Sequence, residues 1–295
     1  MKKQTIVALL SASLLSALFI LNKTTADNNF DHAPIPYIDF DTSMQKYSFE
    51  QIVQTSEPLY NAFKILYERN SPLIMMPGTE LRIPKKLHFI WLGRPMPEEY
   101  NKYINSWREI HPEWEFKMWT EVDVPTFNFK NKDLFDEATN YSRKADIWCL
   151  EILEQFGGLY LNIDFQALKR MDTLHYTYDF YIALQPLDTT MVQLGTGLIA
   201  SIPGHPLLRH AIEKIRETRY IEQIVVATGP LFFTKCYLEY TETGLRDVAF
   251  PATYFYPCGY TQRGLPSEFW YQPEAYAVHH WAGSWLRKEA FIPKV

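Results

Sequence analysis

From residue 81 onward, short apolar runs alternate with longer segments whose apolar residues recur at helical spacing. The predicted elements are, in chain order, a strand over 87–92, a helix over 100–110, a strand over 115–120, a helix over 138–156 and a strand over 159–165. Gly157-Gly158 separates the last two and is typical of a helix end, where a positive φ is needed. Strands that alternate with helices indicate an α/β domain with a mostly parallel sheet.

The N-terminus has a different pattern. Met1-Lys2-Lys3 precedes residues 6–21, which carry no charge and are apolar apart from three serines. This is the pattern of a signal peptide, and the run is shorter than the roughly 20 residues that a membrane-spanning helix needs. Thr24-Thr25-Ala26 supplies small residues for cleavage. We expect residues 1–26 to be a cleaved signal peptide or an uncleaved signal anchor, so that the chain is exported or held at a membrane.

The segment between this signal and residue 81 divides into two parts. Residues 27–46 are polar and contain prolines, which predicts a linker. Residues 47–70 carry apolar positions at helical spacing and predict a pair of amphipathic helices broken at Pro58. The expected organisation is a signal at 1–26, a linker with N-terminal helices at 27–80, and the α/β domain at 81–295.

Composition narrows the class of ligand. The net charge of −5 lacks the basic excess of a nucleic-acid-binding protein, and three cysteines without a close pair exclude a disulfide scaffold. Aromatic residues make up 16% of the chain. They favour either a large aromatic core or flat surfaces that suit sugars and nucleobases.

The strand predicted over 159–165 carries two polar residues. Asn162 and Asp164 are two positions apart, so in an extended strand both side chains point to one side while Ile163 points away. Ligands of open α/β sheets bind at the carboxyl ends of strands. An amide and a carboxylate oxygen there form a pair that suits Mn²⁺ or Mg²⁺ with a diphosphate.

This region resembles the DXD region of the sugar-nucleotide-dependent glycosyltransferases of family 32. That group is similar to the yeast outer-chain α-mannosyltransferases and, more distantly, to the clostridial glucosylating toxins. Further stretches match in order over residues 81–286: IPKKLHFIWLG at 83–93, Asp146 upstream of GGLY at 157–160, GHP at 204–206, TGP at 228–230 and HHWAGSW at 279–285.

The resemblance implies a GT-A fold and a metal-dependent transfer, with retention of configuration, of a hexose from a UDP- or GDP-sugar to a glycan or protein acceptor. Mn²⁺ or Mg²⁺ would be the cofactor, with Asp164 and His280 as its ligands and Asp164 and Asp146 as catalytic residues. His280 is chosen because it stands three residues before Gly283, and an extended chain would point His279 the other way. The implied donor-binding residues are Ile90, Trp91, Arg143, Asp146, Tyr160, Asn162, Ser284 and Trp285.

Two positions depart from the family pattern. Asn162 stands where the family has the first aspartate of its DXD motif, and Cys149 replaces an arginine three residues after Asp146. A ligand without charge lowers metal affinity. An alternative is therefore a sugar- or nucleotide-sugar-binding pseudoenzyme on the same fold. Because nucleotide sugars are cytosolic or luminal, the signal suggests delivery into a host cell or a luminal site in a secretory compartment.

Overall fold

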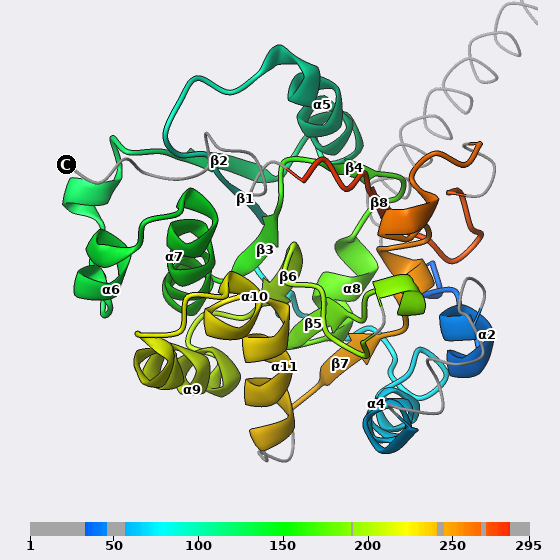
Figure 1. Cartoon of the computed structure of the whole chain (residues 1–295). Coiled ribbons are helices and arrows are strands. Elements are labelled where there is room, and N and C mark those ends of the chain that lie inside the picture. Colours follow the sequence, from blue (N-terminus) through cyan, green and yellow to red (C-terminus); the bar gives the residue numbers. More distant parts are fainter. Residues whose placement is uncertain (1–32, 46–56, 190, 241–244, 267–269, 284–295) are drawn as a thin grey trace, which may run out of the picture. The chain divides into compact units, whose positions relative to one another are not determined.

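The computed structural model describes residues 33–45, 57–189, 191–240, 245–266 and 270–283 (Figure 1). The chain divides into two units, residues 1–34 and 35–295, and the second contains every element described below. The signal expected over 1–26 lies outside the described residues. In the described part, no helix is both long and apolar enough to cross a bilayer.

A six-stranded sheet forms the centre of the domain, in the order β2-β1-β3-β6-β5-β7. Its strands are β1 (Lys86–Ile90), β2 (Glu115–Trp119), β3 (Gly158–Leu161), β5 (Phe180–Ala183), β6 (Leu198–Ser201) and β7 (Asp247–Phe250). The pairs β1/β2, β1/β3 and β5/β7 are parallel, whereas β6 runs antiparallel to both of its neighbours. The predicted α/β domain with a mostly parallel sheet is confirmed.

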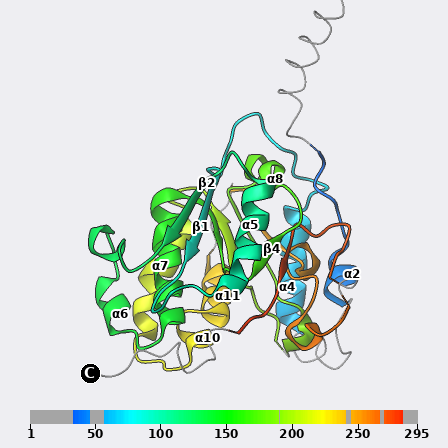
Figure 2. The same cartoon turned by 90° about the horizontal axis from the view of Figure 1, so that it is seen from above.

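Helices cover both faces of this sheet. They are α5 (Asn101–Ile110), α6 (Lys132–Glu137), α7 (Tyr141–Phe156), α8 (Asp172–Thr177), α9 (Pro206–Lys214), α10 (Ile224–Ala227) and α11 (Pro230–Glu239). Figure 2 shows α7 and α5 on opposite sides of β1 and β2. Strands β3, β5 and β6 are buried along their whole length, which explains why they appear in the sequence as continuous apolar runs.

A second, two-stranded sheet pairs β4 (Phe165–Ala167) with β8 (Ala277–His279) in antiparallel register. Trp107 of α5 attaches this sheet to the domain, because its indole Nε1 donates a hydrogen bond of 2.8 Å to the carbonyl oxygen of Phe165. The C-terminal part of the chain is thereby placed beside the segment that follows β3.

The segment expected to be a linker is part of the packed domain from Ile35 onward. It contains α2 (Phe40–Gln45), whose Phe40 and Met44 are buried. Phe40 packs edge-on against Tyr60 of α4 (Glu57–Arg69), with ring centroids 5.2 Å apart. Pro58 lies in the first turn of α4, where the missing N–H costs no helical hydrogen bond. The first of the two expected helices falls on residues 46–56, outside the described residues.

A buried histidine closes the junction between α7 and β3. His88 Nε2 donates to the carbonyl oxygen of Gly157 at 2.9 Å, while His88 Nδ1 accepts from the indole of Trp119 at 3.2 Å. Burial lowers the pKa of His88 to about 4, so the ring stays neutral and keeps one donor and one acceptor. The φ angles of 61° at Gly157 and 101° at Gly158 confirm that the helix ends at the glycine pair.

We predict that Gly158→Ala destabilises the domain by roughly 1–3 kcal/mol. A φ of 101° disfavours any residue with a Cβ, and a Cβ at this position would lie 2.8 Å from the carbonyl oxygen of Lys86. Urea unfolding of the two proteins measures the difference. Gly264→Ala is the control, because a Cβ there would meet nothing within 4 Å. Equal unfolding midpoints for the Gly158 variant and wild type would contradict the role of this junction.

Candidate functional site

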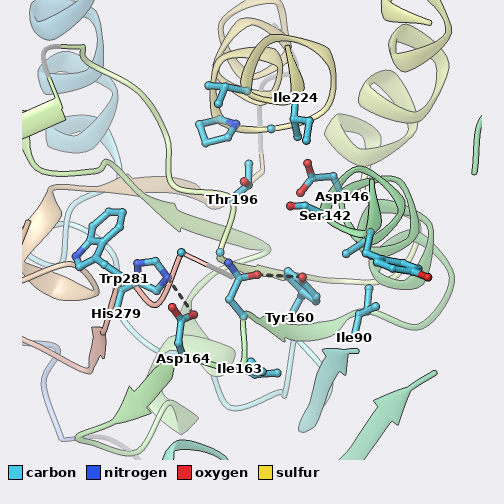
Figure 3. Close-up of a pocket in the computed structure, with 18 of the residues that line it drawn as sticks. Ile90, Ser142, Asp146, Tyr160, Ile163, Asp164, Thr196, Ile224, His279 and Trp281 are labelled. Carbon is cyan, nitrogen blue, oxygen red and sulfur yellow. Dashed lines mark hydrogen bonds and ion pairs between the residues drawn. The ribbon is translucent and has the colours of Figure 1, made fainter. Parts of the chain in front are cut away.

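A pocket of about 480 Å³ opens where β1 and β3 end. Its lining includes six of the residues selected from the sequence: Ile90, Trp91, Asp146, Tyr160, Asn162 and Asp164. They come from three separate elements, namely the end of β1, the helix α7, and β3 with the turn that follows it. Figure 3 shows Asp146 and Asp164 on opposite sides of the cavity, with Tyr160 between them.

The segment that carries Asn162 and Asp164 is a turn, so the expected continuous strand over 159–165 is wrong. Strand β3 ends at Leu161, and the amide of Phe165 donates to the carbonyl oxygen of Asn162 at 3.1 Å. Asn162 and Asp164 both line the pocket, as does Ile163, which the strand pattern had pointed away. The turn, and not the alternation of side chains along a strand, therefore directs Asn162 and Asp164 into the pocket.

The Asp146 side chain is positioned by α7 and by a hydrogen bond from Thr228. It lies one helical turn after Ser142, so both side chains share the pocket-facing side of α7. The hydroxyl of Thr228 donates to Asp146 Oδ2 at 2.7 Å. Burial raises the pKa of Asp146 to about 7, against the opposing effects of this hydrogen bond and of the Arg143 charge. Apart from its opening into the pocket, the carboxyl group is enclosed by protein.

Arg143 is not among the lining residues, although the resemblance implied a donor contact. Its guanidinium donates to the carbonyl oxygens of Thr218, Arg219 and Ile221 at 2.8–3.3 Å. That segment leads into α10, whose Ile224 lines the pocket. In this structure Arg143 therefore fixes a wall of the pocket from outside, because it follows Ser142 and points to another side of the helix.

Aromatic side chains form the end of the pocket nearest to β1. Trp91 is partly exposed, and its indole donates to the carbonyl oxygen of Arg94 at 2.5 Å. Tyr141, at the start of α7, also lines this end. Gly93 has a φ of 94°, and a Cβ there would meet the Tyr141 ring at 2.3 Å. The glycine of the IPKKLHFIWLG stretch thus makes room for an aromatic wall.

Tyr160 lines the pocket, whereas Cys149 is buried outside the lining and contacts the backbone of Asp146. The Tyr160 hydroxyl donates to Asn162 Oδ1 at 3.1 Å, and the Cys149 thiol donates to the carbonyl oxygen of Asp146 at 3.4 Å. Burial raises the pKa of both groups well above their usual values, so both are neutral. The position where the family has arginine is only 2% exposed here.

Asp164 is paired with an imidazole and a backbone amide. His279 Nε2 donates to Asp164 Oδ1 at 3.1 Å, and the amide of Ala282 donates to Oδ2 at 2.8 Å. Burial alone would raise the pKa of Asp164, but the His279 interaction and the Ala282 amide outweigh it and hold the pKa below its usual value. Asp164 is therefore an anion at neutral pH.

The histidine that reaches Asp164 is His279, whereas the sequence analysis selected His280. Strand β8 pairs Phe165 with His279, and neighbouring residues of a strand point to opposite faces. The His280 ring stacks on Tyr103 at 4.3 Å, and its Nε2 lies 2.9 Å from Gln166 Oε1. Burial lowers the pKa of His280 to about 4. Ser284 and Trp285 lie outside the described residues.

Several lining residues were not selected as site residues from the sequence. They are Gln185, Gln193, Thr196, Tyr256, Tyr260 and Trp281. Trp281 lies inside the HHWAGSW stretch, which could have singled it out. The two glutamines belong to no motif, and only the folded chain brings them to the pocket.

The donor atoms around Asp164 suit a divalent cation that is shared with a diphosphate. They comprise the Asp164 carboxylate and the amide oxygen of Asn162. His279 Nδ1 has no hydrogen-bond partner among the described residues, but it points away from Asp164 because Nε2 of the same ring donates to that carboxylate. In the described part of the chain, no three His, Cys, Asp or Glu residues form a ready-made metal cluster. Mg²⁺ commonly takes one or two protein carboxylates and fills its shell with substrate phosphates and water.

Known proteins resemble this chain in the same region. Residues 97–181 match a family described as "Glycosyltransferase sugar-binding region containing DXD motif". Inositol phosphoceramide mannosyltransferase 1 of Schizosaccharomyces pombe is 27% identical over 179 residues, which are 57% of this chain and 55% of that protein. Subversion of eukaryotic traffic protein A of Legionella pneumophila is 26% identical over 196 residues, 56% of this chain and 29% of that protein.

Among solved structures, the PaToxG glycosyltransferase is 15% identical with a TM-score of 0.45, over 64% of this chain and 79% of that one. The chain spans about half the length of the curated relatives it matches. The sequence matches confirm the resemblance described above. Residues 97–181 of this chain resemble the sugar-binding region of the DXD glycosyltransferases, and the chain is similar to mannosyltransferases.

We predict that wild type loses stability relative to Asp146→Asn as pH rises from 4 to 7. The unfolded carboxyl ionises near its usual pKa of 3.8, whereas the folded one holds its proton up to about 7. Folding of wild type therefore takes up a proton between pH 4 and 7. The difference in unfolding free energy between wild type and Asp146→Asn then grows by at most about 1.4 kcal/mol per pH unit. Urea unfolding at several pH values measures it. The exposed Asp136→Asn serves as the control, and parallel pH profiles for the Asp146 variant and wild type would contradict the raised pKa.

Proposed function

We propose that this chain is a metal-dependent glycosyltransferase that moves a hexose from a UDP- or GDP-sugar to a glycan or protein acceptor, with retention of configuration. The observation that carries the proposal is the convergence of Asp146 and Asp164 on one pocket, with Trp91 at its end. The two carboxyl groups lie in opposite environments, since the pKa of Asp146 is raised and that of Asp164 is lowered. A carboxyl group that holds its proton and one that is ionised can serve different roles in a single site.

The aromatic end of the pocket suits the nucleotide part of the donor. Trp91 and Tyr141 offer flat faces on which a base can stack, and Ile90 adds an apolar contact. Asp146 and Ser142 then face the sugar, with oxygens that accept hydrogen bonds from its hydroxyl groups. Tyr160 lies between the two carboxyl groups in Figure 3, and its hydroxyl donates to Asn162, which also lines the pocket.

Asp164 would hold Mn²⁺ or Mg²⁺ together with the diphosphate, and His279 is the imidazole beside it. A bound cation would supply Lewis-acid stabilisation of the charge that develops on the leaving diphosphate. Asp164 is already ionised and needs to lose no proton for this role. Arg94 is the one Lys or Arg among the described lining residues, so the protein itself offers little positive charge to the diphosphate.

Transfer with retention breaks the bond between the anomeric carbon and the diphosphate oxygen and forms the bond to the acceptor oxygen on the same face. The acceptor proton passes to the departing diphosphate. The protein then binds and orients both substrates, and none of its side chains acts as a nucleophile in this scheme. Asp146, on α7, would bind the sugar hydroxyls, and the 162–165 turn would hold the diphosphate.

The N-terminal segment would place this domain where nucleotide sugars exist. Three basic residues flank its uncharged apolar run, as in a signal peptide or signal anchor. The relatives include yeast mannosyltransferases and a Legionella protein named for the subversion of eukaryotic traffic. A luminal site in a secretory compartment and delivery into a host cell both satisfy the need for a donor.

We predict that Asp164→Ala lowers Mn²⁺-dependent donor hydrolysis or transfer by about 100-fold or more, because several kcal/mol of metal-derived stabilisation are lost. Rates are measured with UDP- and GDP-hexoses, and thermal unfolding verifies that the variant is folded. Glu213→Ala removes an exposed carboxylate on α9 and should retain the wild-type rate. Equal rates for Asp164→Ala and wild type would refute the assignment.

A sugar-binding protein without catalysis is the second candidate, and the Asn162 contact favours it. Asn162 is uncharged, and its Oδ1 already accepts from Tyr160. If the chain is an enzyme, wild type is active, and Asn162→Asp lowers the Mn²⁺ concentration for half-maximal rate several-fold, because a second carboxylate adds charge.

The control for this experiment is Gln166→Glu, which adds a carboxylate on the His280 side, outside the pocket lining. It should leave the Mn²⁺ requirement unchanged. Activity that is found only in Asn162→Asp would favour the binding protein over the enzyme.

A further inference from the structure

Two glutamines form a wall of the pocket to which neither the resemblance nor the proposed reaction gives a role. Gln185 follows β5, and Gln193 lies in the segment that leads into β6. The amide of Gln185 donates to the carbonyl oxygen of Gln193 at 2.9 Å, beside an antiparallel bridge between Leu184 and Leu194. Gln193 Nε2 donates to Gln185 Oε1 at 2.9 Å, and both side chains line the cavity.

The side-chain amide of Gln193 is incompletely paired. The residue is only 6% exposed, and its Oε1 has no hydrogen-bond partner anywhere in the part of the chain that the structure describes. A buried amide oxygen without a donor is unfavourable in the free protein. This oxygen is itself enclosed, so the Gln193 side chain must turn toward the cavity for a ligand hydroxyl to donate to it, and that hydrogen bond would then remove the cost on binding.

Aromatic rings continue the same wall. The hydroxyl of Tyr256 donates to the carbonyl oxygen of Gly195, two residues after Gln193, at 2.9 Å. The Trp281 ring lies 5.7 Å from that of Tyr256 and 6.2 Å from that of Tyr260. Trp281 has a φ of 53° and is held by a 2.7 Å hydrogen bond from its indole to the carbonyl oxygen of Cys258. Strain of this kind is concentrated at ligand sites.

This wall lies away from the side of the cavity to which the donor was assigned. Trp281 contacts His279 with ring centroids 4.3 Å apart, and His279 contacts Asp164. In Figure 3, Trp281 and His279 lie on the opposite side of the cavity from Ser142 and Asp146. The diphosphate position proposed at Asp164 therefore lies between the Trp281 end of this wall and α7.

The chemistry of this wall selects a neutral ligand. Amide groups exchange hydrogen bonds with hydroxyls, and aromatic faces pack against the apolar faces of sugar rings. Arg94 is the one Lys or Arg among the described lining residues, and it lies beside Trp91 at the other end. A phosphorylated or carboxylated ligand would find no cation at the glutamines.

We propose that Gln185 and Gln193, with the faces of Tyr260 and Trp281, bind the acceptor, and that the bound part of the acceptor is a neutral sugar or polyol. Gln193 is the specificity-determining residue, since its Oε1 accepts from an acceptor hydroxyl. This inference rests on the proposed glycosyltransferase function and specifies its acceptor class.

The test compares wild type with Gln193→Leu and with the double variant Gln185→Leu/Gln193→Leu. Calorimetry measures the affinity for UDP- and GDP-hexoses in Mn²⁺. Saturation-transfer NMR then measures the affinity for methyl α-D-mannopyranoside and myo-inositol in the presence of the nucleotide that binds. Mannose 6-phosphate is the charged comparison probe. Gln155→Leu, on α7 with its Nε2 on the carbonyl oxygen of Asn128, is the matched control.

We expect Gln193→Leu to weaken binding of the neutral probe about tenfold, as for the loss of one hydrogen bond, while nucleotide-sugar affinity stays within twofold. The double variant should keep its melting temperature, because apolar groups of similar shape replace both partners at little cost. It should bind the neutral probes no better than the single variant does. Gln155→Leu should match wild type in every measurement.

Three results would overturn the inference. The first is a loss of nucleotide-sugar affinity as large as the loss of probe affinity, which would assign the glutamines to the donor. The second is unchanged probe affinity in both variants. The third is tighter binding of mannose 6-phosphate than of the neutral probes by wild type. Wild type that binds no nucleotide sugar at all would instead refute the proposed function. Failure of the acceptor assignment and failure of the proposed function are thereby distinguishable.

Discussion

The junction at Gly157-Gly158 determines where Asp146 and the 162–165 turn lie relative to each other along the sheet. The ten residue steps from Asp146 to Phe156 run about 15 Å along α7, and the four steps from Gly158 through β3 to Asn162 return about 13 Å in the opposite direction. Asp146 and the 162–165 turn therefore reach the same edge of the sheet. The hydrogen bond from His88 to the Gly157 carbonyl fixes that reversal against β1.

Around this junction, the pocket contains two carboxyl groups with opposite proton affinities. Asp146 is surrounded by protein, with one hydroxyl donor, and burial dominates its pKa. Asp164 is the more buried of the two, but its charge interaction with His279 and the hydrogen bonds from His279 and the Ala282 amide favour the anion. The partners of each carboxyl group, and not its depth, thus decide which group stays charged. The neutral Tyr160 and Cys149 nearby add no charge of their own.

The sequence predicted the central elements well because their signals are local. A glycine pair ends α7, and the strands that are buried on both faces are continuous apolar runs. The strand over 159–165 was wrong because the turn is sealed by partners far along the chain, including the Gly197 carbonyl that accepts from Asn162. The choice between His279 and His280 depends on the register of β8 on β4, and a shift of one residue reverses every side chain. Arg143 acquires its surroundings only when a segment 75 or more residues away folds against it. The strand-like pairing that places Gln193 is held by a bond from the Leu194 amide to Thr234, 40 residues along the chain.

The packed segment from Ile35 has a consequence for the order of events during synthesis. Tyr67 and Tyr254 share a hydrogen bond across 187 positions, and Ser43 and Thr253 share one across 210. Contacts of such separation are slow to form, because a long loop must close before they contribute. An emerging chain therefore holds Met44 and Phe63 without their partners Ala252 and Tyr237 until nearly all of the domain has been translated. Chaperones or a translocation machinery would meet these apolar residues first.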